Sequence, residues 1–348
     1  MQQLDSPATD PTSIFEYFRG SYGTELLTAA VAHFDLFGRL AQQPRTLVEL
    51  QTDLNLAERS AIVLTTALQA MGLLTKDSAG KFELTPLAAE HLVRGTEFDV
   101  GSYLSLAATS PGVIEMVERL RTNRPAGLGG DEAGAAFIYR DGMKSAMEQT
   151  QLAEHFTLAL SGRAKNVAPV LAQQVRLNDA TTLLDVGGGT GIYSIAFLKA
   201  NPQLQAIVFD RPEVLKTAER FANDYGVADR LQPQSGDMFA DPLPAADVIL
   251  LSNILHDWDV AECQTLIQRS VKSLNPGGRL IIHDVLLSDE LDGPLPIALY
   301  SAALFSFTEG RAYSAKEYNT WLTEAGLRPQ SPVPTLIHCH AIVAGHAG

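Results

Sequence analysis

The chain has 348 residues, of which 46% are hydrophobic and 19% charged, a composition that excludes a disordered protein and suits two domains. With 40 acidic against 26 basic residues, the formal charge of −14 opposes extended contact with nucleic acid or an anionic membrane. The two cysteines, Cys263 and Cys339, have no metal-ligand spacing, and we expect no metal. The N-terminus lacks a signal-peptide pattern, and no apolar segment approaches the roughly 18 residues of a membrane span, so we expect a soluble cytoplasmic protein.

The N-terminal part of the chain is predicted to be helical. Residues 1–13 are polar with two prolines and are expected to form a mobile tail. Apolar residues at three- and four-residue spacing predict an amphipathic helix over 24–40. Two further helices are expected over 46–56 and 57–74, followed by a small hairpin with its tip at residues 78–80.

Three helices and a hairpin are the layout of a winged helix-turn-helix, with a generic helical cap as the alternative. Between Thr24 and Gly95 there are six basic and eight acidic residues, whereas a duplex-binding domain needs a basic face. The third helix carries Arg59 as its single basic residue and is otherwise mostly apolar, so we expect another subunit to bury it. This segment therefore favours a homodimer over a DNA-binding regulator.

Residues 96–165 read as helical with a glycine-rich break at 124–136. Aromatic and methionine side chains after this break are candidates for the lining of a pocket, although such residues also serve as ordinary core. These candidates are Phe137, Met143, Met147 and Phe156.

After Ala180 strands alternate with helices, which predicts an α/β domain with a parallel sheet and crossover helices on both faces. The expected strands are 181–186, 204–210, 230–237, 246–255 and 278–287. Two final strands, within 327–334 and 335–345, have little chain between them and must pair antiparallel, because a parallel crossover needs about a dozen residues.

The turn "DVGGGTG" after the first of these strands is a candidate ligand-binding turn. Gly187 and Gly189 fit the dinucleotide pattern G-x-G-x-x-G, but Ile192 occupies its third glycine position. The Lys-Ser/Thr pair of a phosphate-binding loop is also missing. A ligand without a diphosphate therefore fits better than a nicotinamide dinucleotide or a nucleoside triphosphate.

Two acidic residues follow the next strands. Asp210 closes the second strand, 23 residues after Gly187, where a carboxylate binds ribose hydroxyls; it is also a candidate helix N-cap. In "SGDMF", Asp237 can accept the adenine amino group while Met238 packs on the ring. Because ligands bind at the carboxyl ends of parallel strands, these positions together predict a nucleoside site.

The motifs "DVGGGTG", "FDRPEV", "GDMF", "HDW" and "NPGGRLIIHD" occur in an order that resembles the S-adenosylmethionine-dependent small-molecule O-methyltransferases, which include caffeic acid, acetylserotonin and bacterial natural-product enzymes. The resemblance covers nearly the whole chain. It implies a Rossmann-like seven-stranded sheet with one antiparallel strand and an N-terminal winged-helix dimerisation domain. We expect the dimerisation domain at 1–100, connecting helices of the acceptor pocket at 101–165, and the catalytic domain at 166–348.

Methyl transfer from a sulfonium to oxygen needs an aligned nucleophile and removal of its proton. The resemblance makes His256 the general base, with Asp284 as its orienting partner. Asp257 contacts the donor or acceptor, or begins the next helix. The second acid of the plant enzymes corresponds to Ala312, a departure for which Glu309 is the candidate substitute.

The same resemblance implies the residues that bind S-adenosylmethionine: Asp185, Gly187, Gly189, Asp210, Arg211, Asp237, Met238, Ser252 and Trp258. Ser252 replaces a basic residue of the plant members. Asn253 and Phe305 join the pocket candidates for a hydroxylated aromatic or polyketide-like acceptor. The alternative is that the chain is an S-adenosylmethionine-binding relative of this family that catalyses hydroxylation or decarboxylation instead of methyl transfer. The acceptor and the methylated position do not follow from the sequence.

Overall fold

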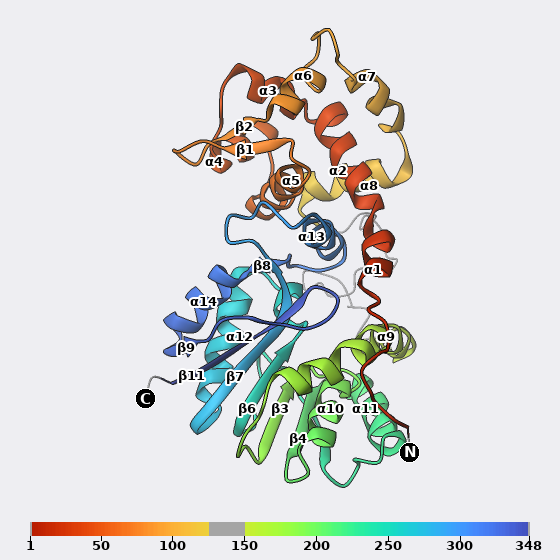
Figure 1. The fold of residues 1–348 in the computed structure, drawn as a ribbon, viewed down its shortest axis with the longest axis vertical. Coiled ribbons are helices and arrows are strands. Elements are labelled where there is room, and N and C mark those ends of the chain that lie inside the picture. Colours follow the sequence, from red (N-terminus) through yellow and green to blue (C-terminus); the bar gives the residue numbers. More distant parts are fainter. Residues whose placement is uncertain (1, 125–149, 347–348) are drawn as a thin grey trace. The chain divides into compact units, whose positions relative to one another are not determined.

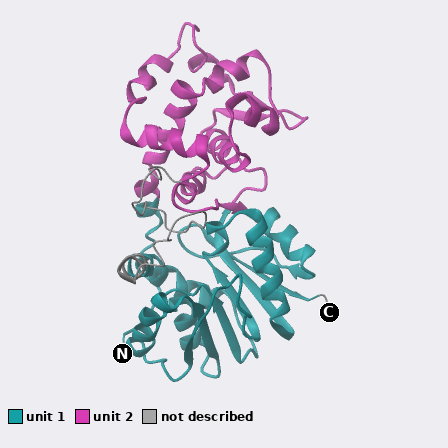
Figure 2. Ribbon diagram, turned by 180° about the vertical axis from the view of Figure 1, so that it is seen from behind, with its two compact units in different colours: residues 1–15, 140–286, 315–348 teal, residues 16–139, 287–314 magenta. Residues whose placement is uncertain are grey.

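The computed structural model describes residues 2–124 and 150–346, with the side chains of 150–156 left out. The chain forms two compact units (Figure 2). Unit 1 comprises residues 1–15, 140–286 and 315–348, and unit 2 comprises 16–139 and 287–314. None of the described helices is both long and apolar enough to cross a membrane.

A central sheet organises unit 1 (Figure 1). Its strands are β3 (Thr182–Val186), β4 (Gln205–Asp210), β5 (Leu231–Ser235), β6 (Ala246–Ser252), β7 (Leu274–Leu287), β9 (Leu327–Pro329), β10 (Val333–Pro334) and β11 (Cys339–His346). The hydrogen-bonded order is β10-β11-β7-β6-β3-β4-β5. Strands β3 to β7 pair in parallel, and β11 runs antiparallel to β7. The α/β fold class and the five parallel strands are confirmed.

Helices cover both faces of this sheet. They are α9 (Thr150–Gln174), α10 (Ile192–Ala200), α11 (Pro212–Asp224), α12 (Val260–Lys272) and α14 (Ala315–Glu324). The chain steps outward from β3 through β4 to β5, then returns to β6 on the other side of β3 and steps to β7. Because parallel crossovers are right-handed, α10 and α11 lie on one face and α12 on the other. The order reverses between β3 and β6, which is where ligands bind in open α/β sheets.

The C-terminal strands differ in detail from the sequence prediction. The single strand expected within 327–334 is two short strands, β9 and β10, and both pair antiparallel with β11. Pro329 and Pro332 lie in and between them. Proline has no N–H to donate to a ladder, so the two prolines break the strand.

The N-terminal segment was expected to be a mobile tail, but the structure gives it contacts with unit 1. The Gln2 amide donates to the Asp224 carbonyl at 2.9 Å, and the Gln173 side chain donates to Ser6 Oγ at 3.1 Å. Thr12 Oγ1 accepts from the Ile337 amide at 3.0 Å. The polar composition of this tail thus supplies side-chain and backbone hydrogen bonds to the folded unit.

Unit 2 is mainly helical. Its elements include α2 (Ser21–Thr28), the π-helix η1 (Ala29–His33), α3 (Leu36–Gln42), α4 (Leu47–Leu54), α5 (Glu58–Ala70), β1 (Leu74–Lys76), β2 (Phe82–Leu84), α6 (Pro86–His91), α7 (Gly101–Leu104), η2 (Ser105–Ala107), α8 (Pro111–Thr122), α13 (Leu295–Phe307) and β8 (Tyr313–Ser314). Helix α1 (Thr12–Arg19) leads into it from the N-terminal segment. The one helix expected over 24–40 is broken at Asp35, which adopts a left-handed conformation with φ of 46°. Aspartate tolerates this conformation better than most residues, and α3 begins after it.

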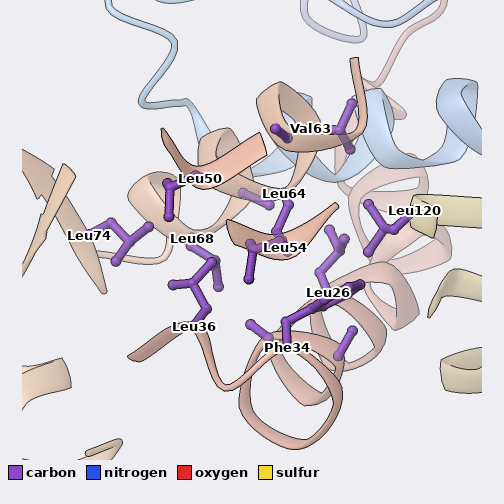
Figure 3. Close-up of a cluster of buried hydrophobic side chains, with 14 of the residues drawn as sticks. Leu26, Phe34, Leu36, Leu50, Leu54, Val63, Leu64, Leu68, Leu74 and Leu120 are labelled. Atoms are coloured by element: carbon purple, nitrogen blue, oxygen red, sulfur yellow. The ribbon is translucent and has the colours of Figure 1, made fainter. Parts of the chain in front are cut away.

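The predicted hairpin is present, with β1 and β2 pairing antiparallel around the turn that contains residues 78–80. Helix α4 begins with a capping box in which Thr46 and Glu49 satisfy each other's backbone amides. Helix α5 is buried on nearly every side by helices of the same chain, including α13, so its burial requires no second subunit. Leucines of α2 to α5 form the core of the unit together with Phe34, Leu74 and Leu120 (Figure 3).

Candidate active site

The glycine turn after β3 and the end of β4 are joined by hydrogen bonds. The Gly189 amide donates to Oδ2 of Asp210 at 2.8 Å, and the Arg211 amide donates to Oδ1 at 2.7 Å. Gly187 and Gly189 have φ of 67° and 60°, values that favour glycine. The N-cap position of α11 is occupied by Arg211, so the alternative that Asp210 is the N-cap is wrong.

The turn also approaches the segment after β6 closely. A Cβ on Gly187 would lie 2.5 Å from Cδ1 of Ile254, so a side chain there would displace the end of Ile254, and the left-handed φ already favours glycine. Below the turn, Asp185 is buried and accepts from Ser194 Oγ at 2.7 Å. Burial raises the pKa of Asp185 to about 7, although the Ser194 hydrogen bond opposes this. This carboxyl therefore titrates near neutral pH.

A hollow of about 390 Å³ opens at the ends of β4 and β5 and is lined by residues 211–213, residues 235–237 and Asp241. Asp237 is exposed at its edge, and its Oδ1 accepts the Phe239 amide at 2.8 Å. Oδ2 of Asp241 in turn accepts the Asp237 amide at 2.8 Å. These bonds fix the loop after β5 and leave the second oxygen of Asp237 for a ligand.

Helix α12 holds this loop from the other side. Arg269 donates from Nε to the Met238 carbonyl at 2.8 Å and from its guanidinium to the Asp241 carbonyl. The ring of Phe239 packs edge-on against Trp258, with ring centroids 4.8 Å apart. Met238 and Trp258, both expected near the adenine, are therefore connected through Phe239.

A chain of hydrogen bonds runs from the end of β6 across the sheet. The Asn253 amide group donates to Ser252 Oγ at 3.1 Å, and Ser252 Oγ lies 2.8 Å from Nδ1 of His283. His283 Nε2 lies 3.1 Å from Thr335 Oγ1, which donates to the Cys339 carbonyl at 3.0 Å. Burial lowers the pKa of His283 to about 3, so this ring is neutral at physiological pH.

Arg163 of α9 meets this chain at Asn253. Its guanidinium donates to Oδ1 of Asn253 at 2.7 Å and contacts Sγ of Cys339 at 2.9 Å. Nδ2 of Asn253 also donates to the Tyr193 hydroxyl at 3.1 Å. Asn253 has a left-handed φ of 55°, and these contacts hold its side chain in one orientation.

His256, in the short 3-10 helix after β6, and Asp284, in the C-terminal part of β7, form a buried pair. Nδ1 of His256 lies 2.5 Å from Oδ1 of Asp284, and the two side chains are 5% and 1% exposed. Asp257 is also buried, with Oδ1 3.7 Å from His256 Nε2. It does not begin the next helix, because the cap of α12 is Asp259. The imidazole thus lies between two carboxyl groups.

The charges of this cluster shift one another's pKa values. Burial alone lowers the pKa of His256, but the carboxylates of Asp284 and Asp257 outweigh it and raise that pKa above its ordinary value. Burial raises the pKa of Asp257 to about 7. The His256 ring and the Val285 amide hold the pKa of Asp284 below its usual range despite burial. Asp284 is therefore the ionised partner of the histidine.

The remaining predicted residues lie elsewhere. Phe137, Met143 and Met147, and the side chain of Phe156, fall outside the described residues. In unit 2, Phe305 is fully buried in the core beneath the Arg59 guanidinium. Ala312 is buried in the same unit and donates its amide to Ser301 Oγ at 3.2 Å, and Glu309 is half-buried.

Three residues of the site were missed by sequence reasoning: Arg163, Arg269 and Tyr318. The Tyr318 hydroxyl donates to Oδ2 of Asp284 at 3.1 Å. Each lies inside an ordinary helical pattern, far along the chain from its partner, so no local signal marks it. Residues 287–314 belong to unit 2, and no pattern in the sequence predicts that this late segment packs with the N-terminal helices.

A parallel sheet with a glycine turn and acidic residues at its carboxyl edge, beside a buried histidine–carboxylate pair, defines a nucleoside-binding enzyme with a candidate general base. Residues 131–328 match the O-methyltransferase domain family. The chain is 33% identical to 3-hydroxy-5-methyl-1-naphthoate 3-O-methyltransferase of Streptomyces sahachiroi, over 91% of this chain and 89% of that one. It is 30% identical to the tetracenomycin polyketide synthesis 8-O-methyl transferase of Streptomyces glaucescens, over 91% of each chain.

A solved structure agrees with this assignment. The O-methyltransferase family 2 protein of Planctomyces limnophilus, crystallised in complex with apigenin, has 47% sequence identity and a TM-score of 0.88, covering 99% of this chain and 98% of that one. The chain therefore belongs to the S-adenosylmethionine-dependent O-methyltransferase family.

Proposed function

We propose that this protein transfers a methyl group from S-adenosylmethionine to a hydroxyl of a small aromatic metabolite, with His256 as general base. The observation that carries the proposal is the 2.5 Å contact between His256 Nδ1 and Asp284 in a buried setting. His256 follows β6, which borders the reversal of strand order beside β3 and its glycine turn, and Asp284 lies near the carboxyl end of the neighbouring strand β7. A ligand in that turn would therefore lie beside the histidine.

The residues at the carboxyl edge fit S-adenosylmethionine. A side chain added at Gly189 would meet no atom within 4 Å, so the turn has open space beside it. We assign Gly187 and Gly189 to the methionine part, Asp210 to the ribose, and Asp237 to the adenine amino group. Each carboxylate oxygen of Asp210 accepts a hydrogen bond from one backbone amide. Each oxygen therefore retains a lone pair that can accept from a ribose hydroxyl. When bound, S-adenosylmethionine supplies an electrophilic methyl group.

His256 handles the proton of the acceptor. With Asp284 ionised, the neutral ring carries its hydrogen on Nδ1 and has a lone pair on Nε2. Nε2 takes the proton of the acceptor hydroxyl as the oxygen forms its bond to the methyl carbon, while the carbon–sulfur bond of the donor breaks and S-adenosylhomocysteine leaves. The resulting imidazolium lies between Asp284 and Asp257, whose charges stabilise it. The proposed step uses no metal, because the donor is already activated and the base removes the proton.

For the acceptor, we propose a flat, hydroxylated aromatic such as a flavone or a hydroxynaphthoate. The support comes from the apigenin bound to the 47% identical structure and from the naphthoate and polyketide named for the relatives. Asn253 and the candidates Phe137, Met143, Met147 and Phe156 remain the proposed lining of its pocket, whereas Phe305 is a fully buried core residue of unit 2 and is not retained. Replacing each by alanine in turn and comparing acceptor KM values tests this set.

The N-terminal part is proposed to be a winged-helix dimerisation domain, with 101–165 contributing to the acceptor pocket and 166–348 to catalysis. The order of three helices and a hairpin in unit 2 supports the first part. Ala312 departs from the plant pattern, and Glu309 is the proposed substitute for the second acid. A Glu309→Gln variant with full turnover would remove Glu309 from the mechanism.

The test of the proposed function is product formation. The protein is incubated with S-adenosylmethionine and a panel of phenols, naphthoquinones and flavones, and S-adenosylhomocysteine and methylated product are followed by mass spectrometry. Equal amounts of both, dependent on one acceptor class, are expected. Donor binding with conversion of an acceptor but no methylated product would favour hydroxylation or decarboxylation instead.

A further inference from the structure

Asp284 is held by more than the histidine. Its Oδ1 lies 2.5 Å from Nδ1 of His256 and accepts the Val285 amide at 2.8 Å. Its Oδ2 accepts a hydrogen bond from the Tyr318 hydroxyl at 3.1 Å. Tyr318 lies on α14 and is fully buried, and its ring packs edge-on against Trp321. All these contacts lie within unit 1. The carboxylate is therefore fixed from two sides, by its own strand and by a helix that follows 34 residues later in the chain.

We propose that Tyr318 is a positioning residue for methyl transfer, whose hydroxyl holds Asp284 as a correctly oriented, ionised partner of His256. The inference rests on the proposed role of His256 as base. A buried carboxylate oxygen without a donor costs free energy, so the Tyr318 hydroxyl stabilises Asp284 in the orientation in which Oδ1 faces His256. Oriented by Tyr318, Asp284 directs the His256 hydrogen to Nδ1 and leaves Nε2 free to accept a proton.

The hydroxyl also affects how strongly His256 holds that proton. The groups that face the ring are Asp284 on β7, Asp257 beside it in the chain, and the Arg163 guanidinium on α9, whose positive charge lowers the pKa of His256. The Tyr318 hydrogen bond is stronger when Asp284 faces a neutral ring than when it faces an imidazolium, because the imidazolium already neutralises part of the carboxylate charge. The bond therefore favours the unprotonated base, and its loss raises the pKa of His256.

The first experiment compares Tyr318→Phe with wild type in the pH dependence of kcat/KM. The acid limb, where His256 becomes protonated, is expected to move to higher pH by about half a unit, which corresponds to a roughly threefold loss of rate below the limb. Tyr225→Phe is the matched control, since Tyr225 is also buried in unit 1 but lies at the end of α11. An acid limb that stays in place in Tyr318→Phe overturns the proposal.

A second variant keeps the packing of the ring. Incorporation of 3-fluorotyrosine at position 318 makes the hydroxyl a stronger donor, and the acid limb is expected to move to lower pH. A shift in the same direction as Tyr318→Phe, or none, contradicts the proposal. His256→Ala separates the two hypotheses: if that variant keeps its turnover, the proposed base is wrong. If it loses turnover while the acid limb of Tyr318→Phe stays in place, only the role of Tyr318 is wrong.

Discussion

The backbone amide of Gly189 donates to Oδ2 of Asp210 at 2.8 Å, which ties the turn after β3 to the end of β4. Because Oδ1 accepts the Arg211 amide, a carboxylate suits this position better than any neutral side chain. The two strands are neighbours in the sheet, so the bond joins the proposed methionine and ribose ends of the donor site.

The first prediction concerns this bond. An Asp210→Asn side chain places an NH₂ group against one of the two backbone amides, so one hydrogen bond is lost and the ribose loses an acceptor. We expect the Kd for S-adenosylmethionine, measured by calorimetry, to rise at least about tenfold, which corresponds to about 1.4 kcal/mol. Asp224→Asn, at the exposed end of α11, is the control. Unchanged donor affinity in Asp210→Asn would exclude Asp210 from the donor site.

The second prediction concerns the base. His256→Ala removes the proton acceptor and is expected to lower turnover by about 10² to 10⁴, the usual contribution of a general base. Donor affinity is expected to change little, because the Gly189 and Asp210 contacts do not involve the histidine. Initial rates and donor calorimetry on the same preparation measure both quantities. His346→Ala, at an exposed position, serves as control. Near-wild-type turnover in His256→Ala would show that His256 is not the general base.

Strand periodicity and glycine chemistry made much of unit 1 predictable. The five parallel strands carry short apolar runs between helical patterns, so their existence and order could be inferred locally. That Gly187, Asp210 and Asp237 share one edge of the sheet was predictable, because each lies at or just after the end of a strand and the carboxyl ends of parallel strands meet at the same edge.

Features that depend on distant contacts were not predictable. Tyr318 touches Asp284 across 34 residues of chain, and its helix has an ordinary amphipathic pattern. The break at Asp35 interrupts a continuous apolar period, because the left-handed residue changes the chain direction without changing the spacing of apolar residues. Helix α5 looked like an intersubunit surface, whereas α13, more than 200 residues later, packs against it. Local patterns cannot identify the partner that buries an apolar face.

The third prediction concerns the loop that carries Met238. Arg269 bonds to the carbonyls of Met238 and Asp241, so Arg269→Met removes both donors and loosens the edge of the hollow after β5. We expect the KM for S-adenosylmethionine to rise about three- to tenfold while kcat at saturation stays within about twofold, since the loop packs on Trp258 at the proposed adenine end of the donor site. Lys272→Met, on the exposed side of α12, is the control. A fall in kcat with unchanged KM would contradict the assignment of this loop to donor binding.

The fourth prediction concerns oligomeric state. Large apolar side chains of unit 2 are exposed on α1 and along α7 and η2, with Tyr103 74% and Leu106 79% exposed. Contiguous exposed apolar groups mark interaction sites, which supports the proposed homodimer. Light scattering at micromolar concentration is expected to give twice the mass of the chain, and Tyr103→Glu combined with Leu106→Glu is expected to reduce that mass. A wild-type monomer would refute the proposal. Val48→Glu combined with Leu87→Glu, exposed sites on α4 and α6, is the charge-matched control.

The last prediction follows from Asp185, whose pKa burial raises from 3.8 to about 7. A carboxyl that binds its proton more tightly in the folded state stabilises the fold at low pH, and that contribution is lost as pH rises toward the folded pKa. Asp185→Asn has no such proton, so its free energy of unfolding relative to wild type is expected to rise between pH 5 and pH 8. The expected change is about 2 to 3 kcal/mol, since each pKa unit corresponds to about 1.4 kcal/mol.

Urea unfolding of both proteins at the two pH values measures this difference. The asparagine oxygen can still accept from Ser194, so the variant keeps the 2.7 Å hydrogen bond that orders the start of α10. The exposed Asp237→Asn is measured in parallel as the control for a carboxyl-to-amide change. A constant difference in Asp185→Asn would mean that Asp185 is ionised throughout this range. The turn would then contain a buried negative charge beneath the proposed donor site even before a ligand binds.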